Sequence, residues 1–446
     1  MSAWHDSPSL PPYLEPPPPY YYCEAEDRQL ELTSNDVRLQ SIASLSLREV
    51  CNWLSATDIS EVARVCREWD TEITRLRWNN IVILGKLDIP ISVFKNLLQN
   101  LPNCREITRR CVATVDISNV EETLYSTLPE TWLATLLAEL PNLRNLRCCR
   151  ATFFNSNVIR LATKFSSGSL MELDLTECKS LTEATLKALI STFPKLRKLI
   201  LDGTSGITDS SLECVARTCH NLEFLSLAHP WSLCDNAIYA IANFCWQHLR
   251  YINITGAVRV TDASAILLVQ RCVLLETIIL KDCYLLTDAV LLEMTCSSCS
   301  NTLQHLDVFG CKSMQLDANI IYQLASNCKG LDSFSFDLLP LIQQYHVNTK
   351  TLLSAFSSLR NLRTIHIHKI YDISSNVQPL MRLLSECPRL EEANFYRTTT
   401  DSDFILGGYA ETSKKSSLTD TASLKELHRL KSGRSISIIL KLEENS

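Results

Sequence analysis

The stretch LMELDLTECKSLTEATLKALI, residues 170–190, joins a short alternating apolar segment to a segment with helical spacing, and Cys178 lies between the two. Its first six residues fit the template L-x-x-L-x-L, whose period of two is typical of a half-buried strand. Nearly the same pattern returns from Leu196. The stretch is therefore one unit of a repeat, and the repeat decides the fold.

The template recurs at almost constant spacing along the chain. Clear copies start at Leu170, Leu196, Leu222, Leu249, Leu275 and Leu303, at intervals of 26, 26, 27, 26 and 28 residues. Weaker copies start at Trp78, Cys104, Leu143, Leu331, Leu362 and Leu390. The interval between Cys104 and Leu143 is enlarged. We expect a solenoid of about twelve repeats over residues 78–397, because single repeats of this length cannot bury their apolar faces.

The second half of each repeat predicts a helix. In ITDSSLECVARTC, residues 207–219, three apolar residues recur at helical spacing. Thr208 is placed to cap this helix, and Asp209 lies at the positive end of its dipole. The Thr-Asp pair returns at 261–262 and 287–288, whereas residue 234 is Cys and keeps only the aspartate after it. The predicted fold class is α/β: a horseshoe with parallel strands inside and the wider helices outside.

The nineteen cysteines are an odd number, so they cannot all be paired within one chain. Disulfide frameworks belong mainly to short secreted chains. The repeats place cysteines in two columns, at the ninth position (Cys178, Cys283, Cys311) and at the helix end (Cys219, Cys245, Cys272, Cys299, Cys328, Cys387). Cys296 and Cys299 have CxxC spacing, but no second CxxC completes a zinc set. We therefore interpret the cysteines as small core residues and expect no metal.

The composition indicates a folded protein without general affinity for polyanions. The 446 residues are 46% hydrophobic and 21% charged, and the formal net charge is −6. This charge argues against general binding to nucleic acid or to an anionic membrane. No apolar run approaches a membrane span, and the first residues lack the pattern of a signal peptide. We therefore expect the cytoplasm, the nucleus or both.

Residues 36–77 predict a small all-α module of two or three short helices ahead of the repeats. Leu47, Val50 and Leu54 share one helical face, and Ile59 and Val65 belong to a second. A module this short cannot stand alone. The few residues between Trp69 and Trp78 include no proline or glycine, so we expect a stiff link to the first repeat.

The repeats resemble the cysteine-containing class of leucine-rich repeat, and the block WLSATDISEVARVCREW, residues 53–69, resembles the second half of an F-box. That family's pattern runs from a leucine to an acidic-aliphatic pair and then to V-C-[RK]-x-W. The matching residues are Leu54, Asp58, Ile59, Val65, Cys66, Arg67 and Trp69. In the first half, Ile42-Ala43 stand where the family has Leu-Pro, while Leu47 and Val50 keep the apolar pattern. The chain thus resembles F-box/leucine-rich-repeat proteins.

This resemblance implies a non-catalytic substrate receptor. In the family, the F-box docks the adaptor of an SCF-type cullin–RING ubiquitin ligase, and the repeats bind the protein to be ubiquitinated. The implied adaptor-binding residues are Leu47, Val50, Leu54, Asp58, Ile59, Val65 and Trp69. No Gly-rich phosphate loop, HExxH or GxSxG motif occurs, so we expect neither an enzyme nor a cofactor.

Two other readings stay open. The segment 36–77 is also consistent with a helical cap on a pure interaction scaffold, with a degenerate F-box that binds no adaptor. In the second, the Pro-rich tail, residues 1–35, recruits the chain to WW-bearing ubiquitin ligases as adaptor or client. That tail carries two overlapping P-P-x-Y patterns built from Pro17, Pro18, Tyr20 and Tyr21. Residues 398–446 form a polar tail, in which SISIILKLEE, residues 435–444, alternates like a closing strand.

The third, fifth and seventh template positions are expected on the concave sheet face. They include an apolar track of Phe224, Tyr251, Ile279 and Phe309, and polar residues His305, Asp307, His366 and His368. Acidic residues in these columns outnumber basic ones six to two. His366 and His368 share one strand face and are consistent with either a metal pair or, as we favour, a polar binding face. We expect this face to bind a protein substrate with a basic and apolar segment.

Overall fold

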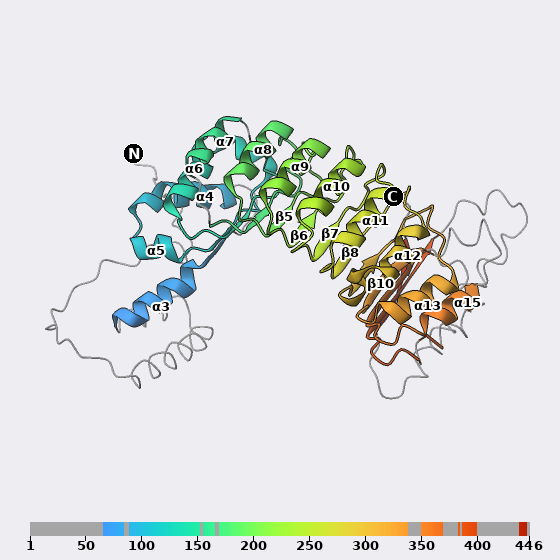
Figure 1. The fold of residues 1–446 in the computed structure, drawn as a ribbon. Coiled ribbons are helices and arrows are strands. Elements are labelled where there is room, and N and C mark those ends of the chain that lie inside the picture. Colours follow the sequence, from blue (N-terminus) through green and yellow to red (C-terminus); the bar gives the residue numbers. More distant parts are fainter. Residues whose placement is uncertain are drawn as a thin grey trace, which may run out of the picture. The chain divides into compact units, whose positions relative to one another are not determined.

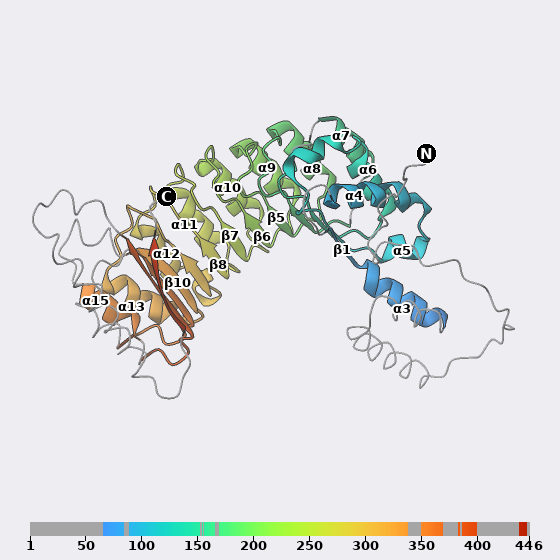
Figure 2. The same ribbon diagram turned by 180° about the vertical axis from the view of Figure 1, so that it is seen from behind.

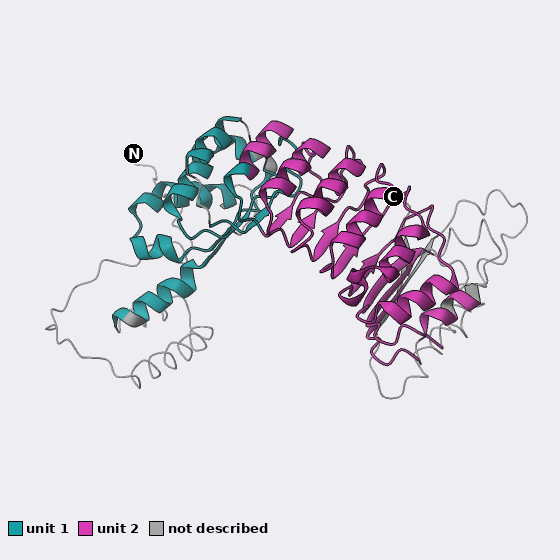
Figure 3. Cartoon of the chain, in the orientation of Figure 1, with its two compact units in different colours: residues 1–181, 191–196 teal, residues 182–190, 197–446 magenta. Residues whose placement is uncertain are grey.

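The computed structural model describes residues 66–83, 89–151, 154, 156–165, 169–337, 349–368, 382–383, 386–398 and 437–443. The chain divides into two compact units (Figure 3). Unit 1 comprises residues 1–181 and 191–196, and unit 2 comprises residues 182–190 and 197–446. The Pro-rich tail and residues 36–65 of the F-box-like module lie outside the described residues.

Unit 1 alternates helices with short parallel strands. Its elements are α3 (Arg67–Trp78), β1 (Asn80–Val82), α4 (Ile89–Asn100), η1 (Leu101–Asn103), α5 (Glu106–Cys111), β2 (Thr114–Asp116), η2 (Glu122–Thr127), α6 (Trp132–Glu139), β3 (Asn145–Arg147), α7 (Ser156–Ala162), η3 (Thr163–Phe165) and β4 (Glu172–Asp174). Strands β1 to β4 pair in chain order, all parallel. Each strand thus belongs to one repeat and pairs with the next repeat's strand.

Unit 2 continues the same alternation. Residues 183–190 of helix α8 (Glu183–Thr192) belong to this unit. Its other elements are β5 (Lys198–Ile200), α9 (Asp209–Thr218), β6 (Phe224–Ser226), α10 (Asp235–Phe244), β7 (Tyr251–Asn253), α11 (Asp262–Arg271), β8 (Thr277–Ile279), α12 (Asp288–Cys296), η4 (Ser298–Asn301), β9 (His305–Asp307), α13 (Ala318–Asn327), β10 (Ser333–Asp337), α15 (Thr349–Phe356), β11 (Thr364–His368), β12 (Glu392–Thr398) and β13 (Ser437–Glu443). Strands β5 to β13 pair in parallel and in chain order. Strand β13 falls within the alternating stretch at 435–444.

The predicted fold class is confirmed: the chain is an α/β solenoid of leucine-rich repeats. Figures 1 and 2 show α9, α10 and α11 side by side along one face of β6, β7 and β8. The middle residue of each of these strands is buried toward the helices: Leu225, Ile252 and Ile278 are 0% exposed. Burial of one such side chain contributes about 1.5–3 kcal/mol, so the repeated apolar positions supply the core.

One repeat lies elsewhere than the sequence predicted. The copy placed at Cys104 is wrong, because Glu106–Cys111 forms helix α5. The strand of this repeat is β2, and Val112, Val115 and Ile117 occupy the buried template positions. With the copy starting at Val112, the enlarged interval is replaced by two intervals, 34 residues from Trp78 and 31 residues to Leu143. Alternation alone did not separate the true copy, VATVDI, from the short helix before it.

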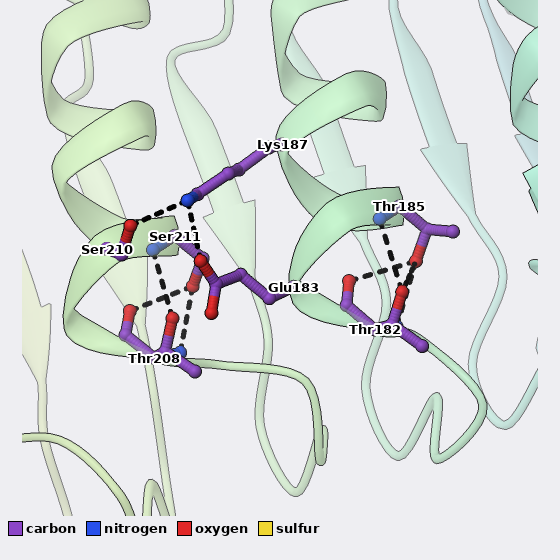
Figure 4. A network of polar contacts seen from close by, with 7 residues as sticks. All are labelled: Thr182, Glu183, Thr185, Lys187, Thr208, Ser210 and Ser211. Carbon is purple, nitrogen blue, oxygen red and sulfur yellow. Dashed lines mark hydrogen bonds and ion pairs between the residues drawn. The ribbon is translucent and has the colours of Figure 1, made fainter.

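The helix starts combine caps with contacts between repeats (Figure 4). As predicted, Thr208 caps α9: its hydroxyl accepts from Ser211 N at 3.2 Å, and its own N–H donates to Ser211 Oγ at 2.9 Å. In the same figure, Lys187 Nζ lies 2.6 Å from Glu183 Oε1 and 2.6 Å from Ser210 Oγ, and so joins α8 to α9. Thr261 differs from the prediction, because its hydroxyl donates to Asp235 at 2.7 Å and does not cap α11.

The eighth template position has left-handed backbone in seven successive repeats. Its residues are Arg150, Glu177, Gly203, His229, Gly256, Asp282 and Gly310, with φ between 54° and 77°. The backbone N–H at this position typically donates to the carbonyl of the seventh position in the next repeat, as from His229 to Thr255 at 2.6 Å. The chain thus leaves each strand through one fixed turn. Sequence reasoning missed it, because four of the seven residues are not glycine.

The two cysteine columns are buried, as predicted. At the ninth position, Cys178, Cys283 and Cys311 each donate to the sixth-position carbonyl of the preceding repeat, at 3.2, 3.3 and 3.0 Å. Among the helix-end cysteines, Cys245 is 0% exposed and lies 3.9 Å from two carbonyl oxygens of the preceding repeat. Cys299 departs slightly, because α12 already ends at Cys296 and Cys299 lies in η4. None of the described cysteines is paired in a disulfide.

Candidate functional site: the exposed face of the unit 2 sheet

The side chains that flank each buried strand residue point away from the core and form the exposed sheet face of unit 2. The strand register places Phe224 beside Tyr251, Tyr251 beside Thr277 and Thr277 beside His305. All four are half-buried or exposed. The third template positions of these four repeats thus lie side by side on one face of the sheet.

An aromatic stack lies on this face across β5, β6 and β7. The rings of Phe224 and Tyr251 are 3.7 Å apart between centroids and 8° from parallel. Lys198 Nζ lies 4.5 Å from the centroid of the Phe224 ring. The three side chains occupy the same template position in successive repeats, which brings them into line. Phe224 thus covers one face of the Tyr251 ring, and Tyr251 remains half-buried.

Next to the stack, a polar network links three successive repeats. Ser226 Oγ donates to Asp202 Oδ1 at 2.7 Å and accepts from Asn253 Nδ2 at 3.1 Å. Asn253 Oδ1 in turn accepts from the backbone and the hydroxyl of Thr255, at 3.0 and 2.6 Å. Asp202 Oδ1 also accepts from Ala228 N at 2.7 Å. The network fixes the rotamers of these side chains and holds a carboxylate at the face.

The electrostatic environment of Tyr251 is acidic. Burial raises the pKa of the Tyr251 hydroxyl, and the carboxylates of Asp202 and Asp307 raise it further. The side-chain hydrogen bond between Tyr251 and Ser226 lowers the pKa of the hydroxyl and so acts in the opposite direction. The same two carboxylates that oppose ionisation of Tyr251 favour a cation near its ring.

The apolar track continues diagonally from Tyr251. Ile279 lies one strand further and two residues further along, and Phe309 repeats this step after β9. Lys281 follows Ile279 by two residues in the same repeat. Its Nζ is 3.3 Å from Asp307 Oδ2 and 5.8 Å from the centroid of the Phe309 ring. The track therefore alternates apolar surface with cation–carboxylate contacts.

The histidines lie further along the sheet. His305 Nδ1 is 3.1 Å from Asp332 Oδ1 and the residue is exposed. His366 Nδ1 lies 3.0 Å from Asn394 Nδ2, and His368 ends strand β11. Within the described ranges, no group of three or more His, Cys, Asp or Glu side chains could hold a metal ion. His305 thus contacts a carboxylate and His366 contacts an amide group.

Of the implied adaptor-binding residues, only Trp69 is described. It lies in the first turn of α3 and is half-buried. Leu47, Val50, Leu54, Asp58, Ile59 and Val65 lie outside the described residues, as do Pro17, Pro18, Tyr20 and Tyr21 of the tail.

Helix α3 is held against the first repeats of unit 1. It runs without interruption from Arg67 to Trp78, and β1 follows after Asn79. Arg105, just before α5, donates to Asp70 at 2.9 Å and to Thr74 at 3.2 Å. Ile73 and Trp78 are buried. The expected stiff link is present here as a continuous, anchored helix.

Comparisons with known proteins add two distant likenesses. No family model matches the chain. The structure resembles a chain of the Rad7–Elc1 complex in yeast, with a TM-score of 0.44 and 17% identity, over 82% of this chain and 93% of that one. It also resembles the leucine-rich-repeat-containing protein LegL7 from Legionella pneumophila, with a TM-score of 0.39 and 12% identity, over 80% and 99%. The fold therefore rests on the strand register and repeat columns described above.

In the part of the chain that the structure describes, no helix is both long and apolar enough to cross a membrane.

Proposed function

We propose that the chain is a non-catalytic substrate receptor of an SCF-type cullin–RING ubiquitin ligase. Its F-box-like module docks the adaptor, and the sheet face of unit 2 binds the protein to be ubiquitinated. The observation that carries the adaptor half is helix α3, which begins with Arg67 and Trp69 of the V-C-R-E-W block and continues into the first repeat. This helix is held against the first repeats by Arg105, which donates to Asp70 and Thr74.

The target half of the proposal is supported by the chemistry of the sheet face. The half-buried Tyr251 ring, with Asp202 and Asp307 acting on it, suits a lysine or arginine side chain. Ile279 and Phe309 suit an apolar neighbour of that cation. Exposed aromatic rings on ordered strands are the usual anchors of protein interfaces. The proposed target therefore carries a segment with basic and apolar residues, and the receptor adds no chemistry of its own.

The experiment that tests the adaptor half is co-purification of the full chain with purified adaptor and cullin. The double variant Leu54→Ala with Ile59→Ala is expected to lose the adaptor, because each truncation removes about 2 kcal/mol from a small interface. The matched control is Leu292→Ala with Tyr322→Ala, two exposed residues on α12 and α13. The control should retain the adaptor, and both variants should melt like the wild type.

An interaction scaffold without ligase function is the competing candidate. It predicts that wild-type protein never co-purifies with the adaptor, although the repeats are folded. Retention of the adaptor by the Leu54→Ala, Ile59→Ala variant would also reject the proposed docking residues.

A further inference from the structure

The edge of unit 2 at which the strands end carries a second set of exposed apolar side chains. These are the tenth and eleventh template positions, in the loops between each strand and its helix. We use the name loop edge for six residues at these positions: Trp231, Val258, Arg259, Tyr284, Leu285 and Lys312. Trp231 is 74% exposed, Leu285 49% and Tyr284 37%. The monomer gains little burial from these side chains, so packing of the core does not explain them.

Contacts between successive loops keep the loop edge ordered. Cys234, in the loop of Trp231, forms a parallel bridge with Arg259 in the next loop. Ser313 Oγ, beside Lys312, donates to the carbonyl of Tyr284 at 2.7 Å. The N–H of Trp231 donates to the carbonyl of His229 at 3.1 Å, within the left-handed turn. Rings held on ordered backbone lose little conformational entropy on binding, which is the property of interface anchors.

The charges of the loop edge are all of one sign. The tenth and eleventh positions of the five repeats that start at Leu196 to Leu303 contain Arg259 and Lys312 but no aspartate or glutamate. Both cations are exposed, and Lys312 Nζ lies 4.4 Å from the centroid of the Tyr284 ring. The sheet face, by contrast, carries the carboxylates of Asp202 and Asp307. The two surfaces of unit 2 thus differ in the charge of the partner that they favour.

We propose that the loop edge is a docking surface for a second protein partner, which binds through an apolar segment flanked by aspartate or glutamate. Trp231, Tyr284 and Leu285 contact the apolar side chains, and Arg259 and Lys312 pair with the carboxylates. Two cations beside exposed rings are too few for a polyanion, and the net charge of −6 opposes nucleic acid or an anionic lipid surface. This docking does not depend on the proposed ligase function.

The test is a selection that retains only peptides which need the two rings. Phage-displayed random dodecapeptides are panned on the full-length protein, with soluble Trp231→Ala, Tyr284→Ala double variant present in excess as competitor. Peptides that bind the sheet face or the tails are removed by the competitor. We expect the surviving sequences to combine aromatic or aliphatic residues with Asp or Glu. Their affinity should fall by roughly tenfold or more for the double variant.

Charge reversal supplies a second, independent readout. Arg259→Glu with Lys312→Glu should weaken the selected acidic peptides, and versions of the same peptides with Lys in place of Asp or Glu should regain affinity. The control Tyr322→Ala changes an exposed ring on α13 and should leave binding intact. All variants should keep the wild-type melting temperature, because the changed side chains are exposed.

Several outcomes would overturn the proposal. These are the absence of any surviving peptide, survivors rich in Lys or Arg, and no rescue by the charge-swapped peptides. Binding of single-stranded RNA, or of vesicles of phosphatidylcholine and phosphatidylserine, that is lost in the double variant would assign the loop edge to another class of macromolecule.

Discussion

Asp262, in the first turn of α11, accepts two hydrogen bonds from Thr287 at the start of α12: 2.8 Å from the backbone N–H and 2.6 Å from the hydroxyl. The same relationship joins Asp235 to Thr261, and Asp209 accepts from the backbone of Cys234 at 2.8 Å. Asp209, Asp235 and Asp262 therefore each connect their own repeat to the following one. They stabilise the stacking of repeats as well as the helix dipole.

The first prediction concerns Asp235, which accepts from Thr261 and from Ser264 Oγ at 2.5 Å. Burial raises its pKa, but these hydrogen bonds outweigh burial and hold the pKa below the ordinary value of 3.8. The folded state therefore prefers the ionised form more than the unfolded state does. This stabilisation is complete above the unfolded pKa and is lost as the pH falls through the folded pKa.

Asp235→Asn should accordingly lower the free energy of unfolding by about 1–3 kcal/mol near neutral pH. The difference from wild type should shrink as the pH falls below 3.8. Urea titrations across that range measure both values. Glu213→Gln, which alters an exposed pair with Arg217, is the control and should change stability by less than about 0.5 kcal/mol. A difference that is independent of pH would contradict the assigned hydrogen bonds.

The alternation of strand and helix was predictable because it depends on spacing within one repeat. The template positions held by Leu170, Leu173 and Leu175 carry apolar residues in the other clear copies as well. These positions are buried, as the pattern predicts. Contacts between repeats were not predictable in the same way. Thr287 donates to Asp262, and Thr261 donates to Asp235 in the preceding repeat. Both contacts depend on the distance between neighbouring helices, which no single repeat encodes.

The same distinction applies to the candidate site. Periodicity assigned Phe224 and Tyr251 to one face, whereas their stacking required the strand register. The loop edge went unnoticed, because exposed residues such as Trp231 follow no apolar period. The misplaced repeat at Cys104 has a third cause: the six-residue helix α5 lies just before the three-residue strand β2, and both fall within one length of the template.

The second prediction concerns the buried thiols. Burial raises the pKa of Cys245 from 9.0 to about 12, so the folded state prefers the protonated thiol. Between these values the unfolded state loses its proton first, and stability falls as the pH rises. One such thiol accounts for about 1.4 kcal/mol per pH unit. The stability of Cys245→Ala should therefore decline less steeply with pH than that of wild type.

Native labelling gives the matching readout for accessibility. Cys296 is exposed on α12 and should react rapidly with iodoacetamide, whereas Cys245 and Cys272 should resist until unfolding. Cys296→Ala is the control for labelling and should lose the rapid reaction while Cys245 stays protected. Rapid native labelling of Cys245 would contradict its assignment to the core.

The third prediction concerns the left-handed turn at Gly310, where φ is +77°. A Cβ there would lie 2.1 Å from Asp282 Oδ1 and 3.1 Å from Asp282 N. Gly310→Ala should cost about 1–2 kcal/mol from backbone strain alone, and more from this contact. Gly256→Ala is the matched control: φ is +76°, but the nearest atom, His229 Nδ1, is 3.1 Å away.

Chemical denaturation of both glycine variants separates strain from contact. Gly310→Ala should be the less stable of the two, and the difference should shrink when Asp282→Ala is added. Equal losses at both glycines would show that the contact with Asp282 relaxes freely, and that the shared backbone strain is the whole effect.

The last prediction tests the sheet face through Tyr251. The ring stacks on Phe224, and the carboxylates of Asp202 and Asp307 act on its hydroxyl. Tyr251→Ala should lower stability by only about 0.5–1.5 kcal/mol, because the stack is exposed on one side. It should, however, abolish capture of immobilised peptides that pair Lys or Arg with an apolar residue. Tyr251→Phe keeps the ring and should retain most of this binding, whereas Asp202→Asn should weaken it and reduce its sensitivity to salt. Trp231→Ala, on the loop edge, should leave these peptides unaffected. If Tyr251→Ala captures them as well as wild type does, the target does not bind through the aromatic stack.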